Sequence, residues 1–360
     1  MARTYDESLV AAIEAGARRV EEDGLELELR PIPDDDREHV LDPRVLELTL
    51  RKMGGAVTVV AMDDVISMRS RPNKETHPID DGSVVETRQI MNFGDRGIPL
   101  HVWRPENARP GSPVFYFIHG GGWTSGIIAG YVNAMRYLAQ VTGCVVVYPE
   151  YRLAPECPFP GPVDDCVATL RWLRDHAAEL GIDVSKLAIG GDSAGGSLTN
   201  AVVLTCQDEI PASLVVNIFP CVDSDPATKM DGFSYDEYPA IEEQATAAKM
   251  RVDRIKDSKV DVLYTLYDES RLADPLISAA KATDDQLRRF PRLLMVDSEY
   301  DFLRIQDEAF ARRLAGLGVD VRCIRYLGCD HGWFESCGVM PQAEDLCRVI
   351  ADEMRRVFGA

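Results

Sequence analysis

The chain has 360 residues, of which 59 are acidic and 39 are basic, and its formal net charge is −20. A chain of this length forms one large α/β domain with insertions or two modest domains, with room for a substantial buried core. Because the negative charge repels phosphate groups, neither nucleic acid nor an anionic membrane surface is an expected partner. The expected partner is an uncharged or cationic small molecule, and a homodimer is left open.

The composition also bears on compartment and cofactors. The opening residues carry no apolar signal segment, and no later run approaches the roughly 18 uninterrupted apolar residues of a membrane helix, so stable membrane insertion is not expected. The nine cysteines include no Cys-x-x-Cys pair. This pattern predicts free thiols in a reducing compartment rather than disulfides or a zinc site. We therefore expect a cytoplasmic protein without a metal.

The first part of the chain has the pattern of helices. Apolar residues recur at helical spacing between residues 6 and 22, and Asp23-Gly24 follows as a stop signal. A second stretch with helical spacing surrounds residues 45–50. We therefore expect residues 1–80 to form an N-terminal helical accessory region, and residues 81–360 to form the main α/β domain.

Strand and helix patterns alternate in the rest of the chain. Two strand patterns, at 84–90 and 98–103, predict an antiparallel start. The patterns that follow predict a mostly parallel central sheet flanked by helices. An acidic stretch at 223–273 interrupts them and is expected to be an irregular insertion before the last strands. Further strands are expected at 114–118, 144–148, 187–189, 214–219, 293–296 and 321–324, and helices near 131–141, near 163–180 and from 194.

The segment Gly191-Asp192-Ser193-Ala194-Gly195 stands between an apolar run and a helix pattern. A Gly-x-Ser-x-Gly turn between a strand and a helix needs its glycines, because bulkier residues would collide where the backbone bends, and it leaves the serine hydroxyl exposed. A serine hydroxyl becomes a good nucleophile when a base takes its proton and a carboxylate orients that base. Ser193 is therefore the candidate nucleophile.

Chain order indicates the base and narrows the choice of acid. In sheets that carry this turn the order is serine, acid, histidine, and His331 is the one histidine after Ser193. Position favours Asp301 as the acid, because it follows the strand pattern at 293–296 by one short loop. The alternatives that remain between that strand and the base are Asp297, Asp307 and Asp330.

A second apolar run, Val114 to Ile118, ends in His119-Gly120-Gly121-Gly122-Trp123. During acyl transfer the attacked carbonyl oxygen becomes an anion, and each backbone N–H group preset around it contributes about 3 kcal/mol in a dry site. Glycines let such donors approach closely, so this loop and the N–H group of Ala194 are expected to bind the anion. The run lacks the Gly-Lys-Ser/Thr ending of a phosphate-binding loop.

Together these segments resemble the bacterial hormone-sensitive-lipase-like family of α/β-hydrolase esterases, over roughly residues 95–345. The resemblance implies an α/β-hydrolase fold whose site is covered by an N-terminal helical cap, read as residues 1–80, and by the insertion at 223–273. The motifs that carry it are His119-Gly120-Gly121-Gly122-Trp123, Tyr148-Pro149-Glu150-Tyr151-Arg152-Leu153-Ala154-Pro155-Glu156, Pro158-Phe159-Pro160, Gly191-Asp192-Ser193-Ala194-Gly195-Gly196, Asp301-Phe302-Leu303-Arg304 and His331-Gly332-Trp333.

The resemblance implies a role for single residues within these motifs. The catalytic residues are Ser193, Asp301 and His331, and the oxyanion hole is formed by Gly121, Gly122 and Ala194. His119 and Gly120 are structural supports of the glycine loop. The residues expected to contact the substrate are Trp123, Asp192 and Trp333, with a place in the core as the alternative for Trp333. Arg152 and Glu156 are expected to form a structural polar pair beside the site.

The function that the resemblance implies is that of a serine carboxylesterase without metal or organic cofactor. Such an enzyme hydrolyses small or short-acyl esters through an acyl-enzyme on Ser193, and its partner is a small-molecule ester. One alternative is an acyltransferase that uses the same acyl-enzyme with an alcohol or amine as acceptor. The other is a hydrolase fold that only binds a small molecule, which the presence of all three catalytic residue types disfavours.

Overall fold

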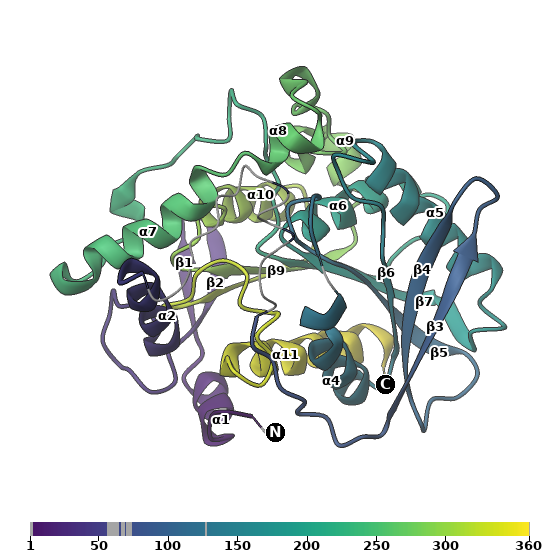
Figure 1. The fold of residues 1–360 in the computed structure, drawn as a ribbon, viewed down its shortest axis with the longest axis horizontal. Coiled ribbons are helices and arrows are strands. Elements are labelled where there is room, and N and C mark those ends of the chain that lie inside the picture. Colours follow the sequence, from purple (N-terminus) through teal and green to yellow (C-terminus); the bar gives the residue numbers. More distant parts are fainter. Residues whose placement is uncertain (1–2, 56–64, 66–68, 70–73, 127, 360) are drawn as a thin grey trace.

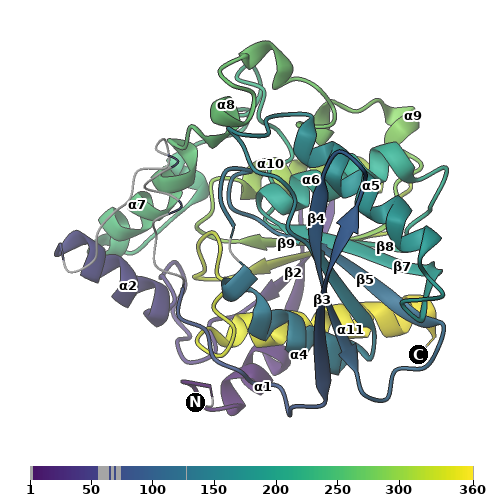
Figure 2. The same cartoon turned by 45° about the vertical axis from the view of Figure 1, so that its right-hand side comes forward.

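The computed structural model describes residues 3–55, 65, 69, 74–126 and 128–359. These residues form a ten-stranded sheet with helices on both faces (Figures 1 and 2). The strand order is β1-β2-β10-β9-β8-β7-β5-β6-β4-β3. The pairs β1–β2, β3–β4 and β4–β6 are antiparallel. The neighbouring strands between them in the sheet, β2-β10-β9-β8-β7-β5-β6, all pair in parallel. The prediction of a mostly parallel sheet flanked by helices is therefore confirmed.

The central strands are runs of buried apolar side chains, which is typical of parallel strands that are covered on both faces. All residues of Val145–Pro149 and of Leu214–Ile218 are buried. Helices therefore have to cover both faces of the sheet. The strands are β1 Arg18–Glu22, β2 Leu25–Arg30, β3 Val84–Asn92, β4 Gly97–Pro105, β5 Ser112–Ile118, β6 Val145–Pro149, β7 Ile182–Asp192, β8 Leu214–Ile218, β9 Arg292–Ser298 and β10 Val321–Tyr326.

The helices form two layers around this sheet. In Figures 1 and 2, α4 and α11 lie on one face, and α5, α6 and α10 lie on the other. Helices α7 and α8, which belong to the insertion, lie beyond the second layer. The helices are α1 Ser8–Ala15, α2 Pro43–Met53, α4 Val132–Thr142, α5 Gly161–Asp175, α6 Ala194–Cys206, α7 Ala245–Lys256, α8 Val260–Tyr264, α9 Asp284–Leu287, α10 Arg304–Gly316 and α11 Pro341–Phe358.

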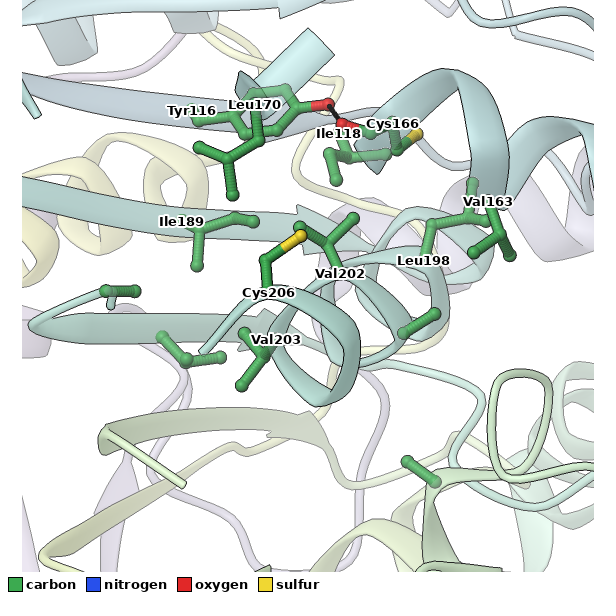
Figure 3. Packing of buried hydrophobic residues seen from close by; sticks show 14 of the residues in the cluster. Tyr116, Ile118, Val163, Cys166, Leu170, Ile189, Leu198, Val202, Val203 and Cys206 are labelled. Carbon is green, nitrogen blue, oxygen red and sulfur yellow. Dashed lines mark hydrogen bonds between the residues drawn. The ribbon is translucent and has the colours of Figure 1, made fainter. Parts of the chain in front are cut away.

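Strand β5 shows how the sheet divides the core in two. Phe115 and Phe117 belong to one hydrophobic cluster, whereas Tyr116 and Ile118 belong to the other, because successive side chains of a strand point to opposite faces. Figure 3 shows the second cluster, in which Tyr116 and Ile118 meet side chains of α5 and α6. The Tyr116 hydroxyl donates to the carbonyl oxygen of Cys166 at 3.0 Å. This packing holds α6, and hence the turn that precedes it, against the sheet.

The N-terminal region differs from the expected helical accessory region. The helix predicted for residues 6–22 ends at Ala15, and residues 18–22 and 25–30 form β1 and β2. Strand β2 pairs in parallel with β10, so this part extends the central sheet. The helical prediction is wrong there, because tertiary strand pairing outweighs local periodicity. The patch around 45–50 is α2 as predicted, and residues 1–2, 56–64, 66–68 and 70–73 of the region lie outside the described residues.

The insertion at 223–273 is less irregular than predicted. It contains the twelve-residue helix α7 and the short helix α8. The first part of the segment, up to Gln244, contains only turns and short 3₁₀ helices. Within the described part of the chain, we find no helix with the length and apolar composition needed to cross a membrane.

Candidate active site

Ser193 occupies the sharp turn between the end of β7 and the start of α6. Its backbone has φ 55° and ψ −124°, a region that non-glycine residues enter only where the surrounding structure holds them. The two glycines that flank it pack against backbone. A Cβ atom on Gly195 would lie 2.6 Å from the carbonyl carbon of His119, and one on Gly191 would lie 2.6 Å from that of Gly195. The glycine spacing of the motif therefore reflects close approach of three backbone segments.

His331 lies between Ser193 and Asp301. The His331 Nε2 atom is 2.8 Å from Ser193 Oγ, and the His331 Nδ1 atom is 2.6 Å from Asp301 Oδ2. A carboxylate only accepts hydrogen bonds, so Nδ1 carries the ring proton and Nε2 accepts from the serine hydroxyl. The Asp301 side chain is 1% exposed and also accepts the backbone N–H of Leu303 at 3.1 Å. The structure thus brings together the three residues that the sequence had placed far apart.

The other aspartates considered as the acid have different partners. Asp297 is fully buried and accepts from the thiol of Cys323 at 3.6 Å. Asp307 is also fully buried, and burial together with the neighbouring Asp297 raises its pKa well above the usual range. Asp330 precedes the base, but its carboxylate faces Arg251, at 3.3 Å from the arginine Nε. Of the four candidates, Asp301 is the one in contact with the His331 ring.

The glycine loop is held from behind by Asp192. The N–H group of Gly120 donates to Asp192 Oδ1 at 2.9 Å, and the Tyr131 hydroxyl donates to Oδ2 at 3.0 Å. Burial, followed by the charge of Glu335, raises the pKa of Asp192 to about 7. The N–H group of Gly120 therefore has a partner within the protein and is not available to bind an oxyanion.

The three residues expected in the oxyanion hole lie next to the serine. Gly121 and Gly122 have φ values of 113° and 61°, which glycine adopts at no steric cost. Gly122 and Ala194 line the cavity together with Ser193. Gly121 is not among the lining residues and packs against the next turn of the loop, where a Cβ atom would be 2.6 Å from the carbonyl carbon of Ser125. In the described segments, none of the three N–H groups donates to another loop or side chain.

His119 is part of the wall behind the glycine loop. Its ring stacks on Tyr151 with a centroid distance of 4.2 Å, and the Tyr151 hydroxyl donates to the His119 carbonyl at 2.8 Å. Burial lowers the pKa of His119 to about 4, so its imidazole is neutral at pH 7. Its ring nitrogen Nδ1 lies 2.8 Å from the carbonyl oxygen of Gly120, which ties the ring to the loop.

Two residues expected to contact the substrate do not line the cavity. Asp192 is 3% exposed and is occupied by Gly120 and Tyr131, so its prediction as a substrate-binding residue is wrong. Trp333 is 4% exposed, and its Nε1–H donates to Ser298 Oγ at 2.8 Å. It lies in the core, which was the alternative for this residue. Trp123 does line the cavity.

A cavity of about 580 Å³, including its open mouth, lies over Ser193. The insertion supplies much of its wall, which no single-residue prediction had named. On the insertion side the Lys229 ammonium pairs with Asp261 Oδ2 at 3.2 Å. Val260 lies so near the glycine loop that a Cβ atom on Gly122 would be 2.9 Å from the Cβ atom of Val260. The lining residues are Gly122, Trp123, Ser193, Ala194, Cys221, Asp223, Ser224, Lys229, Ile255, Lys256, Ser258, Val260, Asp261, Phe302, Leu303, Gln306 and His331.

Trp123 owes its position to a partner in the insertion. Its ring stacks on Tyr264 at a centroid distance of 4.7 Å and an interplanar angle of 3°. Tyr264 is fully buried, so this stack fixes the cavity wall beside the glycine loop. The sequence offered no signal for the pair, because its two members are far apart in the chain and come from segments without a shared pattern.

The predicted pair of Arg152 and Glu156 is not formed. Arg152 instead binds the buried carboxylate of Asp165 in α5, at 2.8 Å. Glu156 pairs with Arg69 at 2.6 Å. The prediction is wrong because the turn that contains both residues directs them to different neighbours.

Within the described residues, no three His, Cys, Asp or Glu side chains are grouped as they would be around a metal ion. The nine cysteines are free thiols, as predicted.

Comparison with known proteins assigns the chain to a family. A family model described as the alpha/beta hydrolase fold matches residues 115–335, which is more than half of the chain, and the chain belongs to this family. An arylesterase of Saccharolobus solfataricus is 35% identical over 259 residues, which cover 70% of this chain and 78% of that protein. Carboxylesterase NlhH of Mycobacterium tuberculosis is 31% identical over 263 residues, covering 72% and 79%.

Solved structures show the same fold. Carboxyl esterase 2 of Tuber melanosporum is 25% identical with a TM-score of 0.69, and the match covers 88% of this chain and 99% of that one. An esterase from Rhizomucor miehei superposes with a TM-score of 0.74 over 90% of this chain and 99% of the other, at 24% identity. The resemblance inferred from the motifs is thus confirmed at the level of the α/β-hydrolase family.

Proposed function

We propose that the protein is a serine carboxylesterase that hydrolyses small carboxylic esters through an acyl-enzyme on Ser193. The observation that carries the proposal is the hydrogen-bonded series Ser193–His331–Asp301 at the base of a cavity. A serine with this arrangement around it is an activated nucleophile. The names of the curated relatives, an arylesterase and a carboxylesterase, support the same activity.

In the first half of the proposed reaction, Ser193 Oγ attacks the ester carbonyl carbon while its proton passes to His331 Nε2. The carbonyl π bond becomes an oxyanion, which the N–H groups of Gly122 and Ala194, with that of Gly121, would stabilise. Collapse of this intermediate breaks the bond to the alcohol oxygen, which takes the proton from Nε2. Asp301 holds the ring in the tautomer that this shuttle needs.

In the second half, water takes the place of the alcohol. His331 Nε2 accepts a proton from water as its oxygen attacks the acyl carbon, and the same nitrogen returns that proton to Ser193 Oγ when the acid leaves. The neutral, buried His119 stays outside this cycle, since both its ring and its carbonyl are bound within the wall.

The insertion is proposed to act as a cap that limits the substrate's size. A Cβ atom on Gly122 would lie 2.9 Å from the Cβ atom of Val260, and residues between 223 and 261 line the cavity together with Phe302 and Leu303. A preference for short acyl groups, which the family resemblance implies, is also part of the proposal.

The proposal is tested by turnover of p-nitrophenyl acetate and butyrate. Ser193→Ala and His331→Ala are each expected to lower kcat by about 10⁴-fold or more, because the members of such a series act as one unit. His119→Asn is the matched control, because His119 is a histidine beside the site that takes no part in the proton transfers. The folded variant is expected to keep ester hydrolysis by Ser193. Retention of most activity in Ser193→Ala would overturn the proposal.

A further inference from the structure

The loop that carries His331 is held by a helix of the insertion. Helix α7 places Arg251 and Arg254 three residues apart, which sets both side chains on one face of the helix. The Arg254 Nη2 group donates to the backbone carbonyl of His331 at 2.7 Å. The Asp330 Oδ2 atom lies 3.3 Å from Arg251 Nε and 3.6 Å from Arg254 Nη2. Two guanidinium groups thus bind two consecutive residues of the base loop.

This contact is buried and charged. Arg251 is 2% exposed and Asp330 is 6% exposed. Burial lowers the pKa of Arg251, and although burial opposes ionisation of Asp330 too, the charges of Arg251 and Arg254 hold its pKa below the usual range. Removal of one member of a buried ion pair leaves the other charge uncompensated and is far more damaging than loss of a surface pair. The position of Asp330 is therefore strongly tied to α7.

The neighbouring residues of the loop are held by other parts of the molecule. The backbone N–H of Gly328 donates to Glu299 Oε2 at 2.7 Å, and the Gly328 carbonyl accepts from the N–H of Asp42 at 2.9 Å. After the base, the Gly332 carbonyl accepts from Lys74. Between these anchors, Asp330 and the His331 carbonyl contact side chains of α7. The charges of Lys52 and Lys74 also act on Asp330.

The same helix also forms part of the cavity wall. Ile255 and Lys256 follow Arg254 directly in α7, and both line the cavity over Ser193. A substrate in that cavity therefore contacts the helix that holds the base. The geometry gives α7 two roles at once, one at the wall and one at the catalytic loop.

We propose that Arg251 and Arg254 are positioning residues, which hold the His331 ring in line with Ser193 and Asp301 through Asp330 and the His331 carbonyl. The insertion is then part of the catalytic machinery and not only a cover. This inference rests on the proposed function for its kinetic consequences, but the placement of the ring can be measured without turnover. A displacement of about 1 Å in a reacting group costs about 100-fold in rate, which sets the scale of the expected effect.

The kinetic test uses Arg254→Met, which keeps the length of the side chain but removes its donors. We expect kcat on p-nitrophenyl acetate to fall by about 10- to 100-fold with KM changed by less than about threefold, because the base and not the substrate wall is disturbed. Arg254→Lys restores a donor and is expected to recover part of the loss. Lys249→Met, on an exposed part of the same helix, is the matched control and is expected to behave as the unmodified chain.

A spectroscopic test separates this inference from the proposed activity. The Nδ1 proton of His331, bound to Asp301 at 2.6 Å, is expected to give a low-field proton NMR resonance that disappears in His331→Ala. It should persist in Lys249→Met and weaken or vanish in Arg254→Met. If the unmodified chain shows this resonance but hydrolyses no ester, the proposed function fails while the positioning role stands.

A second variant keeps the inference open to refutation if Arg254→Met does not fold. The double replacement Arg251→Met with Asp330→Leu removes the most buried pair of charges together, a change that well-packed proteins tolerate, and leaves Arg254 on the His331 carbonyl. It is expected to fold and to lose kcat as Arg254→Met does. Unchanged kcat and an unchanged resonance in either folded variant, or an equal loss in Lys249→Met, would overturn the proposal.

Discussion

The two halves of the site, the serine turn and the histidine loop, are held in place by different forces. Ser193 sits at the end of a central strand, where its own N–H donates to the Ile218 carbonyl at 2.9 Å and where glycines allow three backbone segments to touch. His331 lies in a loop at the end of β10, where side chains from α7 bind its carbonyl and its neighbour Asp330. One half is fixed mainly by backbone geometry, and the other mainly by side-chain charge.

This difference indicates how each half responds to change. A backbone arrangement that depends on close approach fails when any side chain is added, whatever its chemistry. An arrangement that depends on ion pairs fails when one charge is removed and can be restored by a chemically similar group.

The largest effect is expected for Asp301→Asn, which tests the acid on the histidine side. Asparagine fills the same space but no longer fixes the Nδ1–H tautomer of His331, so kcat is expected to fall by about 10⁴-fold. Asp297→Asn is the matched control, because Asp297 lies nearby without touching the ring and burial already raises its pKa well above the usual range. Ester hydrolysis rates of both variants check the assignment, and a larger loss in Asp297→Asn would move the acid to that residue.

A smaller but still severe effect is expected for Gly195→Ala on the serine side. The new Cβ atom would lie 2.6 Å from the His119 carbonyl carbon, a backbone atom that cannot swing away. We expect a loss of about 3 kcal/mol or more in unfolding free energy, with activity falling in parallel. Gly316→Ala provides the control, since a Cβ atom at this helical position meets nothing within 4 Å.

Gly316→Ala is expected to raise the unfolding free energy by up to about 1 kcal/mol, because alanine has the higher helix propensity. Urea unfolding followed by circular dichroism measures both variants. Equal stability of the two would show that the serine turn has room for a side chain and that backbone contact does not define this half of the site.

The smallest effect among the site residues is expected from the pH dependence of stability at Asp192. Burial, with the charge of Glu335, raises its pKa to about 7, against about 3.9 for an aspartate in an unfolded chain. The folded protein thus holds the extra proton, and the stability that this contributes is complete below about pH 4 and is lost as the pH rises through about 7.

Asp192→Asn removes this titration while keeping an oxygen for the N–H of Gly120. Relative to the unmodified chain, the variant is expected to gain on the order of 2 kcal/mol in unfolding free energy between about pH 5 and pH 8. Urea unfolding at several pH values checks the sign. A difference between the two proteins that stays constant with pH would refute the assignment.

The parts of the fold that were predicted correctly are those with a strong local pattern. The apolar runs at 114–118 and 214–219 became β5 and β8, because buried parallel strands need nothing but apolar side chains. The helix predicted at residues 6–22 is α1 followed by β1 in the structure. Local periodicity does not reveal the pairing of β1 with β2 or of β2 with β10. The acidic insertion likewise concealed α7, whose apolar face is weak.

The prediction of single site residues divides in the same way. Asp301 stood out among four aspartates by its distance from a strand, and the structure places it on the His331 ring. The resemblance implied a substrate contact for Asp192, but its buried side chain binds Gly120 and Tyr131. Arg251 and Arg254 carried no motif, since their partners lie about 80 positions further along the chain.

By itself the sequence determined most strands and helices of the central α/β domain, the glycine-flanked turn and the residue types for acid–base chemistry on a serine. These follow from backbone stereochemistry and hydrophobic periodicity, which act over a few residues. The tertiary structure alone decided which carboxylate meets the base, which charges anchor the base loop and what lines the cavity. Such contacts join residues that are distant along the chain, and their energies depend on burial and on distances that no local pattern specifies.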